Sequence, residues 1–130
     1  VREPNVVRLN DGSYRMYYIE AASVGTFTWH INSAVSPDGM SWTAEPGTRI
    51  ARSVGGVQVG SPEVLTLPDG TYRMYFSGSG RLATTAGNIL SATSPDGVNW
   101  VREPGIRLSA GDQEGDQGAL WSPAIVTLCV

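Results

Sequence analysis

The sequence predicts an all-β fold of the β-propeller type, with two four-stranded antiparallel blades followed by the first strand of a third. Three observations predict it: an internal repeat, a hairpin motif that occurs twice, and short apolar runs separated by turn residues. The 130 residues include 16 Gly and 8 Pro, a composition that suits a β-rich fold with many turns. Units of about 40–60 residues with four antiparallel strands are typical of propeller blades. A sandwich built from duplicated halves is the alternative.

The hairpin motif reads Ser-Pro-Asp-Gly-Met-Ser-Trp at Ser36–Trp42 and Ser-Pro-Asp-Gly-Val-Asn-Trp at Ser94–Trp100. The proline fixes one φ, the aspartate can bond its own backbone, and the glycine allows a positive φ, so the motif predicts a tight turn. A tryptophan three residues after the glycine can fold back over that turn. We therefore expect a structural role for Asp38, Trp42, Asp96 and Trp100.

The repeat is much wider than this turn. A shift of 58 residues aligns Pro4–Ile50 with Pro62–Leu108 without a gap, and 22 of the 47 aligned pairs are identical. A further copy begins at Ser122–Leu128, which matches Ser61–Leu67. The expected organisation is a first blade over residues 1–58, a second over 59–118, and over 119–130 the inner strand of an incomplete or donated blade.

In the first unit, a hairpin turn at Asn10–Gly12 separates two apolar runs. The second of these runs, Tyr14–Ile19, is apolar at successive positions, which predicts burial on both faces of the sheet. The polar stretch Glu20–Trp29 is expected to be a loop. The strands expected in the two units are Asn5–Leu9, Tyr14–Ile19, Ile31–Val35 and Ser41–Ala44, then Val64–Leu67, Tyr72–Ser77, Ile89–Thr93 and Asn99–Arg102.

Charge and cysteine content limit the classes of partner and the covalent bonds that the chain can have. The net charge is −3, with 9 basic and 12 acidic residues interspersed, and this does not favour nucleic acid or an anionic membrane as a partner. No apolar run reaches the roughly 18 residues of a membrane span. Because Cys129 is the only cysteine, no internal disulfide can form, and we expect it to be a small buried residue.

The first blade reads Pro-x-Val-Val-x-Leu-x-Asp-Gly-x-Tyr-Arg-Met-Tyr-Tyr from Pro4, followed by Ser-Ala-x-Ser-Pro-Asp-Gly-x-x-Trp from Ser33. This pattern resembles the blades of the five-bladed β-propeller glycosidase superfamily, which includes arabinanase- and β-xylosidase-like enzymes. The hairpin motif also resembles the Asp box of sialidase propellers, although it is one residue shorter. In those propellers the Asp box is structural, which implies the same role here.

The resemblance implies three carboxylates on the inner strands of successive blades: a base, a carboxylate that tunes a pKa, and a general acid. Glu3 stands at the position of the base, just before Pro4, and Glu63 stands at the tuning position, just after Pro62. Both are Glu where the family has Asp. Before Pro123, where the general acid is expected, the sequence has Trp121-Ser122. The implied catalytic set is therefore incomplete.

These residues predict a glycosidase-like module that binds carbohydrate or is catalytically incomplete, and that completes its ring by self-association. One alternative is an active inverting glycoside hydrolase with a composite site, in which a neighbouring copy donates a carboxylate such as Glu114 or Asp116. Another alternative is a purely structural propeller-assembly protein. Fold similarity does not decide among them.

The loops supply the candidate substrate contacts, since aromatic rings can stack on sugars. These candidates are Phe27, Trp29, His30 and Trp121. Trp29 can instead cap the blade edge. Asp112, Glu114 and Asp116 alternate as calcium ligands do, but the twelve-residue calcium-loop pattern is incomplete, so a solvated acidic loop is the simpler interpretation and no other cofactor is expected.

Three pairs of charged residues recur at the 58-residue spacing. A residue repeated in each blade serves the blade rather than a single active site, so we expect Arg–Asp pairing or guanidinium stacking on neighbouring tyrosines. The pairs are Arg15 and Arg73, Asp11 and Asp69, and Arg49 and Arg107.

Overall fold

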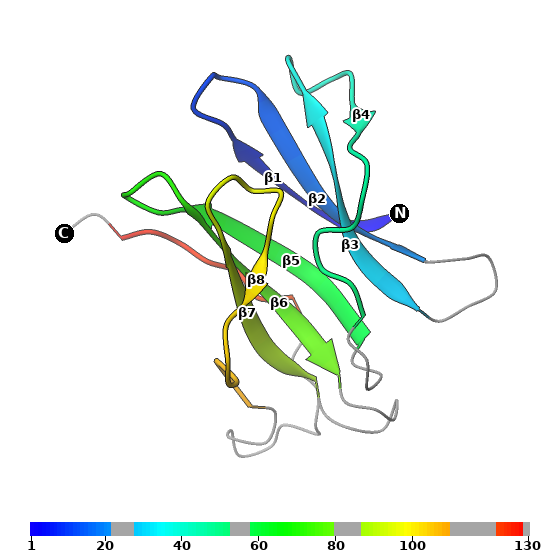
Figure 1. Cartoon of the computed structure of the whole chain (residues 1–130), viewed down its shortest axis with the longest axis vertical. Coiled ribbons are helices and arrows are strands. Elements are labelled where there is room, and N and C mark those ends of the chain that lie inside the picture. The colour runs from blue at the N-terminus through cyan, green and yellow to red at the C-terminus, as the bar shows by residue number, and fades with distance from the viewer. Residues whose placement is uncertain (22–27, 53–57, 80–86, 110–121, 129–130) are drawn as a thin grey trace.

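The computed structural model describes residues 1–21, 28–52, 58–79, 87–109 and 122–128. They form two four-stranded antiparallel sheets, in the orders β1-β2-β3-β4 and β5-β6-β7-β8 (Figure 1), so the all-β, propeller-type prediction is confirmed. The strands are β1 (Arg2–Arg8), β2 (Tyr14–Ala21), β3 (Trp29–Ser36), β4 (Thr43–Ala44), β5 (Gln58–Thr66), β6 (Tyr72–Ser79), β7 (Asn88–Ser94) and β8 (Val101–Arg102). Within these ranges, the chain has no helix of the length and apolarity that a membrane crossing needs.

The two sheets pack face to face, and β5 contacts β1, β2 and β3 of the first sheet. One hydrophobic core therefore runs through both sheets. Tyr17 in β2 and Phe76 in β6 are fully buried in it. The expectation that the second strand is buried on both faces is met in the first sheet, where Tyr17, Tyr18 and Ile19 are all buried.

The β3–β4 and β7–β8 turns have the same local structure. In the first, which we call the first Asp turn (residues 36–42), Oδ1 of Asp38 accepts hydrogen bonds from the amides of Met40 and Ser41. The indole of Trp42 folds back and donates to the Gly39 carbonyl at 3.2 Å. In the second Asp turn (residues 94–100), the corresponding indole bond of Trp100 is 3.0 Å long.

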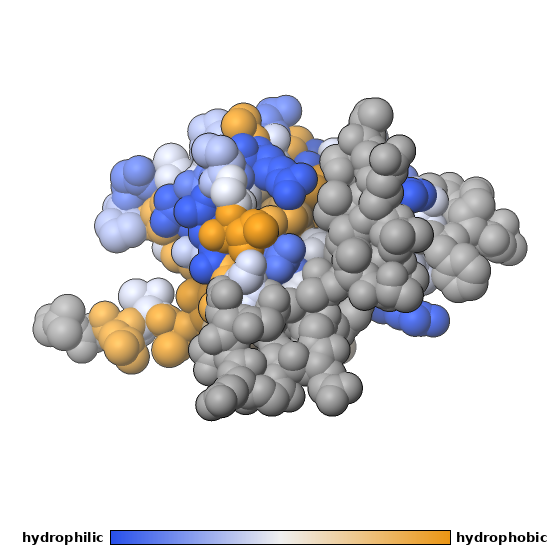
Figure 2. Space-filling view, turned by 90° about the horizontal axis from the view of Figure 1, so that it is seen from below, coloured by the Kyte–Doolittle hydropathy of each residue, from blue (hydrophilic) through white to orange (hydrophobic). Residues whose placement is uncertain are grey.

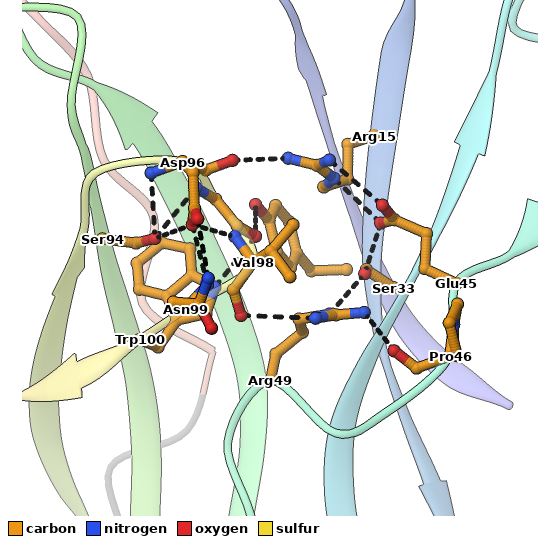
Figure 3. Close-up of polar contacts among 12 residues, drawn as sticks. Arg15, Ser33, Glu45, Pro46, Arg49, Ser94, Asp96, Val98, Asn99 and Trp100 are labelled. Atoms are coloured by element: carbon orange, nitrogen blue, oxygen red, sulfur yellow. Dashed lines mark hydrogen bonds and ion pairs between the residues drawn. The ribbon is translucent and has the colours of Figure 1, made fainter.

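The first blade holds the second Asp turn through three consecutive backbone carbonyls, those of residues 96–98. Their donors are Arg15 at 3.0 Å, Tyr17 at 2.8 Å and Arg49 at 3.3 Å. The Trp100 ring meets the Tyr17 ring edge-on, with centroids 5.7 Å apart. Figure 3 shows the two guanidinium groups reaching from the first sheet toward this turn.

The expected Arg–Asp pairing is wrong. Arg15 forms a two-pronged ion pair with Glu45, with N–O distances of 2.9 and 3.1 Å. Asp11 instead accepts hydrogen bonds from the amide and hydroxyl of Ser13, so its carboxylate is occupied by its own turn. In the second blade Arg73 pairs with Glu103 through a single contact of 3.2 Å, and Asp69 accepts from Thr71 as Asp11 does from Ser13.

The inner strands differ from expectation at their beginnings. β1 and β5 start at Arg2 and Gln58, several residues before the expected starts, and both contain a proline. Residues 122–128, where a further inner strand is expected, are not part of a sheet. Val126 and Leu128 there are 75% and 76% exposed. The segment leading to the C-terminus projects from the body as a largely hydrophobic arm (Figure 2).

Candidate functional site at the mouths of the inner strands

The strand register brings several candidate residues to one end of the blades. Arg2 of β1 pairs with Ile19 of β2, and Ala21 pairs with Trp29 of β3. In the second sheet Gln58 of β5 pairs with Ser79 of β6. The beginnings of the inner strands and of the third strands therefore lie at the same end, opposite the Asp turns (Figure 1).

Each inner segment carries an unusual backbone conformation just before its proline. Glu3, Ser61 and Ser122 have positive φ angles of 52°, 46° and 54°. In β1 and β5 this residue lies in a register shift, between Arg2 and Asn5 and between Gly60 and Glu63. Such a bulge re-aims a side chain. Holding a non-glycine residue there costs about 1–3 kcal/mol, a cost that concentrates at functional sites.

These three side chains meet in one polar line. Both the amide and the hydroxyl of Ser61 donate to Oε2 of Glu3, the hydroxyl at 2.9 Å. The Ser61 hydroxyl lies 3.3 Å from that of Ser122. Ser122 thus holds the same position at the start of the third segment as Ser61 holds in the second and Glu3 in the first.

A second polar link joins the same two strands. The side-chain amide of Asn5 donates to Oε2 of Glu63 at 2.8 Å, and its carbonyl accepts from the Val64 amide at 3.0 Å. Burial raises the pKa of Glu63, and the hydrogen bond from Asn5 opposes this shift. Glu63 is consequently a half-buried carboxyl that is easier to protonate than usual.

Gly60 allows the carboxylate of Glu3 to lie against the backbone of β5. A Cβ at this position would stand 3.3 Å from Oε2 of Glu3 and 3.2 Å from the hydroxyl of Ser77, tighter than ordinary contacts. Sequence reasoning missed Asn5, Gly60 and Ser61 as parts of the site. The available signal was the X-Pro dipeptide that recurs at the same place in each copy of the repeat.

The loop candidates are only partly described. Trp29 is half-buried against the core, and the guanidinium of Arg2 lies 5.3 Å from its ring centroid. His30 accepts a hydrogen bond at Nδ1 from the Arg52 amide at 3.2 Å. Neither is joined to the polar line by a hydrogen bond that the structure describes. The other candidates lie outside the described residues: Phe27, Trp121, Asp112, Glu114 and Asp116.

Within the described ranges, no three His, Cys, Asp or Glu side chains gather closely enough to hold a metal ion. A pocket of about 190 Å³ lies between the two blades. It is lined by Arg49, Ile50, Ala51, Val59, Phe76, Trp100 and Arg102.

Comparison with known proteins points to one architecture. No protein-family model matches the chain, and no curated protein matches its sequence significantly. Solved structures do match. A family 117 glycoside hydrolase of the marine bacterium Zobellia galactanivorans superposes with a TM-score of 0.71 at 24% identity, over 91% of this chain and 42% of that one.

Two further matches are a fructan 1-exohydrolase of Cichorium intybus and an α-L-arabinofuranosidase of Lactobacillus brevis. The first has a TM-score of 0.69 at 21% identity and covers 88% of this chain and 23% of that one. The second has a TM-score of 0.62 at 18% identity and covers 86% and 38%. The chain spans less than half the length of each of these proteins. It therefore has the fold of part of a β-propeller, as its sequence motifs predicted.

Proposed function

We propose that this chain is a carbohydrate-recognising propeller module whose site is the polar line of Glu3, Ser61 and Ser122, together with the Asn5–Glu63 pair. One observation carries the proposal: three successive segments bring a polar side chain to one place from the same positive-φ backbone conformation. Carboxylates and hydroxyls are the groups that hydrogen-bond sugar hydroxyls. The names of the matching structures, a fructan exohydrolase and an arabinofuranosidase, support a furanoside ligand.

Binding fits this site better than hydrolysis by the chain alone. Inversion needs an acid and a base, about 6.5–9.5 Å apart, on either side of the scissile bond. Ser122 stands near the position that the resemblance gives to the general acid, and a hydroxyl cannot fill that role. Glu3 is held by two hydrogen bonds from Ser61, which position it as a fixed acceptor.

An inverting hydrolase is the second candidate, and one observation favours it. A general acid needs a raised pKa, and burial raises the pKa of Glu63. In that reading Glu63 protonates the leaving group and Glu3 activates water. The resemblance assigns Glu63 to pKa tuning instead. Glu63→Gln would remove the proton donor in the first case and the charge that tunes another group's pKa in the second.

Calorimetric titration with arabino-oligosaccharides and with inulin-type fructo-oligosaccharides tests the proposal. We expect saturable binding to one of these series. Glu3→Gln should weaken it by about fivefold, because a charge-assisted hydrogen bond becomes a neutral one, a difference of about 1 kcal/mol. Asp11→Asn is the matched control, because it removes a carboxylate at the opposite end and keeps the oxygen that Ser13 bonds.

Turnover separates the two candidates. Release of nitrophenol from an aryl arabinofuranoside or xyloside, abolished by Glu63→Gln, would establish the hydrolase. Saturable binding without turnover supports recognition. If neither series binds and neither aryl glycoside is cleaved, the carbohydrate proposal fails.

A further inference from the structure

The second blade carries a copy of the side chains with which the first blade holds the second Asp turn. Arg73, Tyr75 and Arg107 stand 58 residues after Arg15, Tyr17 and Arg49. We call these three residues the docking face. In the first blade, their counterparts bind the carbonyls of residues 96–98. Among the described residues, no third sheet covers the docking face.

Exposure indicates that this face lacks a partner among the described residues. The side chain of Arg73 is 35% exposed, against 10% for Arg15. Leu108 is 43% exposed, whereas Ile50 at the equivalent place is 9% exposed. Nε of Arg73 is buried without a hydrogen-bond partner, although the matching atom of Arg15 bonds Glu45. The second blade thus presents a formed but unfilled binding surface.

The first Asp turn is the complementary half. Its hydrogen bonds from the serine hydroxyl to the tryptophan indole recur in the second Asp turn, which adds one bond from the Asn99 side chain to Asp96. In the described structure, no donor from another sheet reaches the carbonyls of residues 38–40. Met40 at its tip is 85% exposed. The same turn that is docked in the second blade is therefore free in the first.

We infer that the first Asp turn of one copy of this chain docks on the docking face of another copy, head to tail. The three carbonyls of residues 38–40 would accept from Arg73, Tyr75 and Arg107, and the Trp42 ring would meet the Tyr75 ring edge-on. A second copy is the fitting occupant, because this chain carries both halves of a contact that it already makes internally. The two surfaces differ, so the contact is heterologous and joins copies in a row or a ring. The inference is independent of the carbohydrate proposal.

A glycine controls the fit. A Cβ on Gly97 would lie 2.6 Å from Nη1 of Arg15 and 2.7 Å from the hydroxyl of Tyr17, so a docked turn has no room for a side chain there. A Cβ on Gly39 would meet only Tyr14 of its own blade, at an ordinary 3.7 Å. A side chain at position 39 therefore leaves the free chain unobstructed and blocks docking.

Three variants of the chain test the inference. Gly39→Asn fills the first Asp turn, and asparagine is the residue after glycine that best tolerates its φ of 79°. Gly47→Asn is the matched control, since its φ is 81° and open space surrounds it. The double variant Arg73→Ala, Arg107→Ala removes the docking face. Circular dichroism and melting curves check that each variant is folded.

Sedimentation and light scattering over a concentration series give the readout. We expect the wild-type chain and Gly47→Asn to associate as concentration rises. Gly39→Asn and the double variant should each have a dissociation constant raised by about tenfold or more, since several hydrogen bonds are lost together. An equimolar mixture of these two should form a dimer and nothing larger, because each supplies the half that the other lacks. The inference is overturned if the wild-type chain stays monomeric, if Gly39→Asn associates like Gly47→Asn, or if the mixture does not pair.

Discussion

The hydroxyl of Tyr17 gives a direct measure of how strongly the two blades hold each other. Tyr17 is fully buried, and its hydroxyl donates to the Gly97 carbonyl of the other sheet at 2.8 Å. Tyr17→Phe keeps the ring and its edge contact with Trp100 and removes only the hydroxyl. Because the carbonyl stays buried, the loss combines the hydrogen bond with part of a desolvation penalty, about 1–2 kcal/mol.

The repeat supplies the control within the same molecule. Tyr75 is the equivalent residue of the second blade, is half-buried, and faces no further sheet in the described structure. In dilute solution, Tyr75→Phe should change the free energy of unfolding by less than about 0.5 kcal/mol, as surface changes do.

Urea unfolding provides the assay. With an m value of about 1.5 kcal/mol/M, the Tyr17 variant should lose about 1 M in its midpoint while its slope stays unchanged. Equal losses in the two variants, or no loss in Tyr17→Phe, would refute the reasoning, because then the hydrogen bond between blades would not distinguish the two positions.

Two pH predictions follow from the carboxyl groups. Hydrogen bonds from Asn99 and from the amide of Val98 lower the pKa of Asp96, so the stability it contributes is present above the unfolded pKa of 3.8 and is lost as pH falls through the folded pKa. Urea midpoints should therefore fall steeply below about pH 4. Asp96→Asn should make that fall less steep, and an equally steep fall in the variant would contradict the assignment. Burial raises the pKa of Glu63 above 4.5, so the stability it contributes is present below 4.5 and is lost as pH rises through the folded pKa. The free energy of unfolding of Glu63→Gln should therefore fall less between acidic and neutral pH than that of the wild-type chain. An equal fall in the two proteins would count against the raised pKa.

The sequence predicts those parts of the fold that short segments determine. The Pro-Asp-Gly turn is determined by the proline ring, the aspartate carboxylate and the glycine, which allows a positive φ. All three act within four residues, so the turn can be predicted locally. The 58-residue period then makes the second blade a copy of the first. Ion pairing depends on register across the sheet, and so the partner of Arg15 was wrong: Glu45 is 30 residues away, while the nearer Asp11 is engaged by its own turn.

The candidate site was predictable only in part. The resemblance pointed to Glu3 and Glu63, and the structure places both at the inner-strand mouths. It also joins them to Ser61, which only the recurring X-Pro dipeptide marked, and to Asn5, which no local pattern marked. The early start of β1 escaped prediction because the polar residues and proline of its first half do not alternate as strand residues do. Hydrogen bonds on either side of the bulge, visible only in three dimensions, carry the strand through it.

The backbone conformation before each proline does not depend on the side chain at that position. The same left-handed conformation holds a glutamate in the first segment and serines in the next two. A replacement at such a position inherits conformational strain that the fold already carries. Ser61→Asp would place a second carboxyl beside Glu3, and two adjacent negative charges would raise the pKa of one of them. At these three positions the side chain can therefore change while the backbone stays the same, and one substitution can create a pair of carboxyl groups that shares a proton.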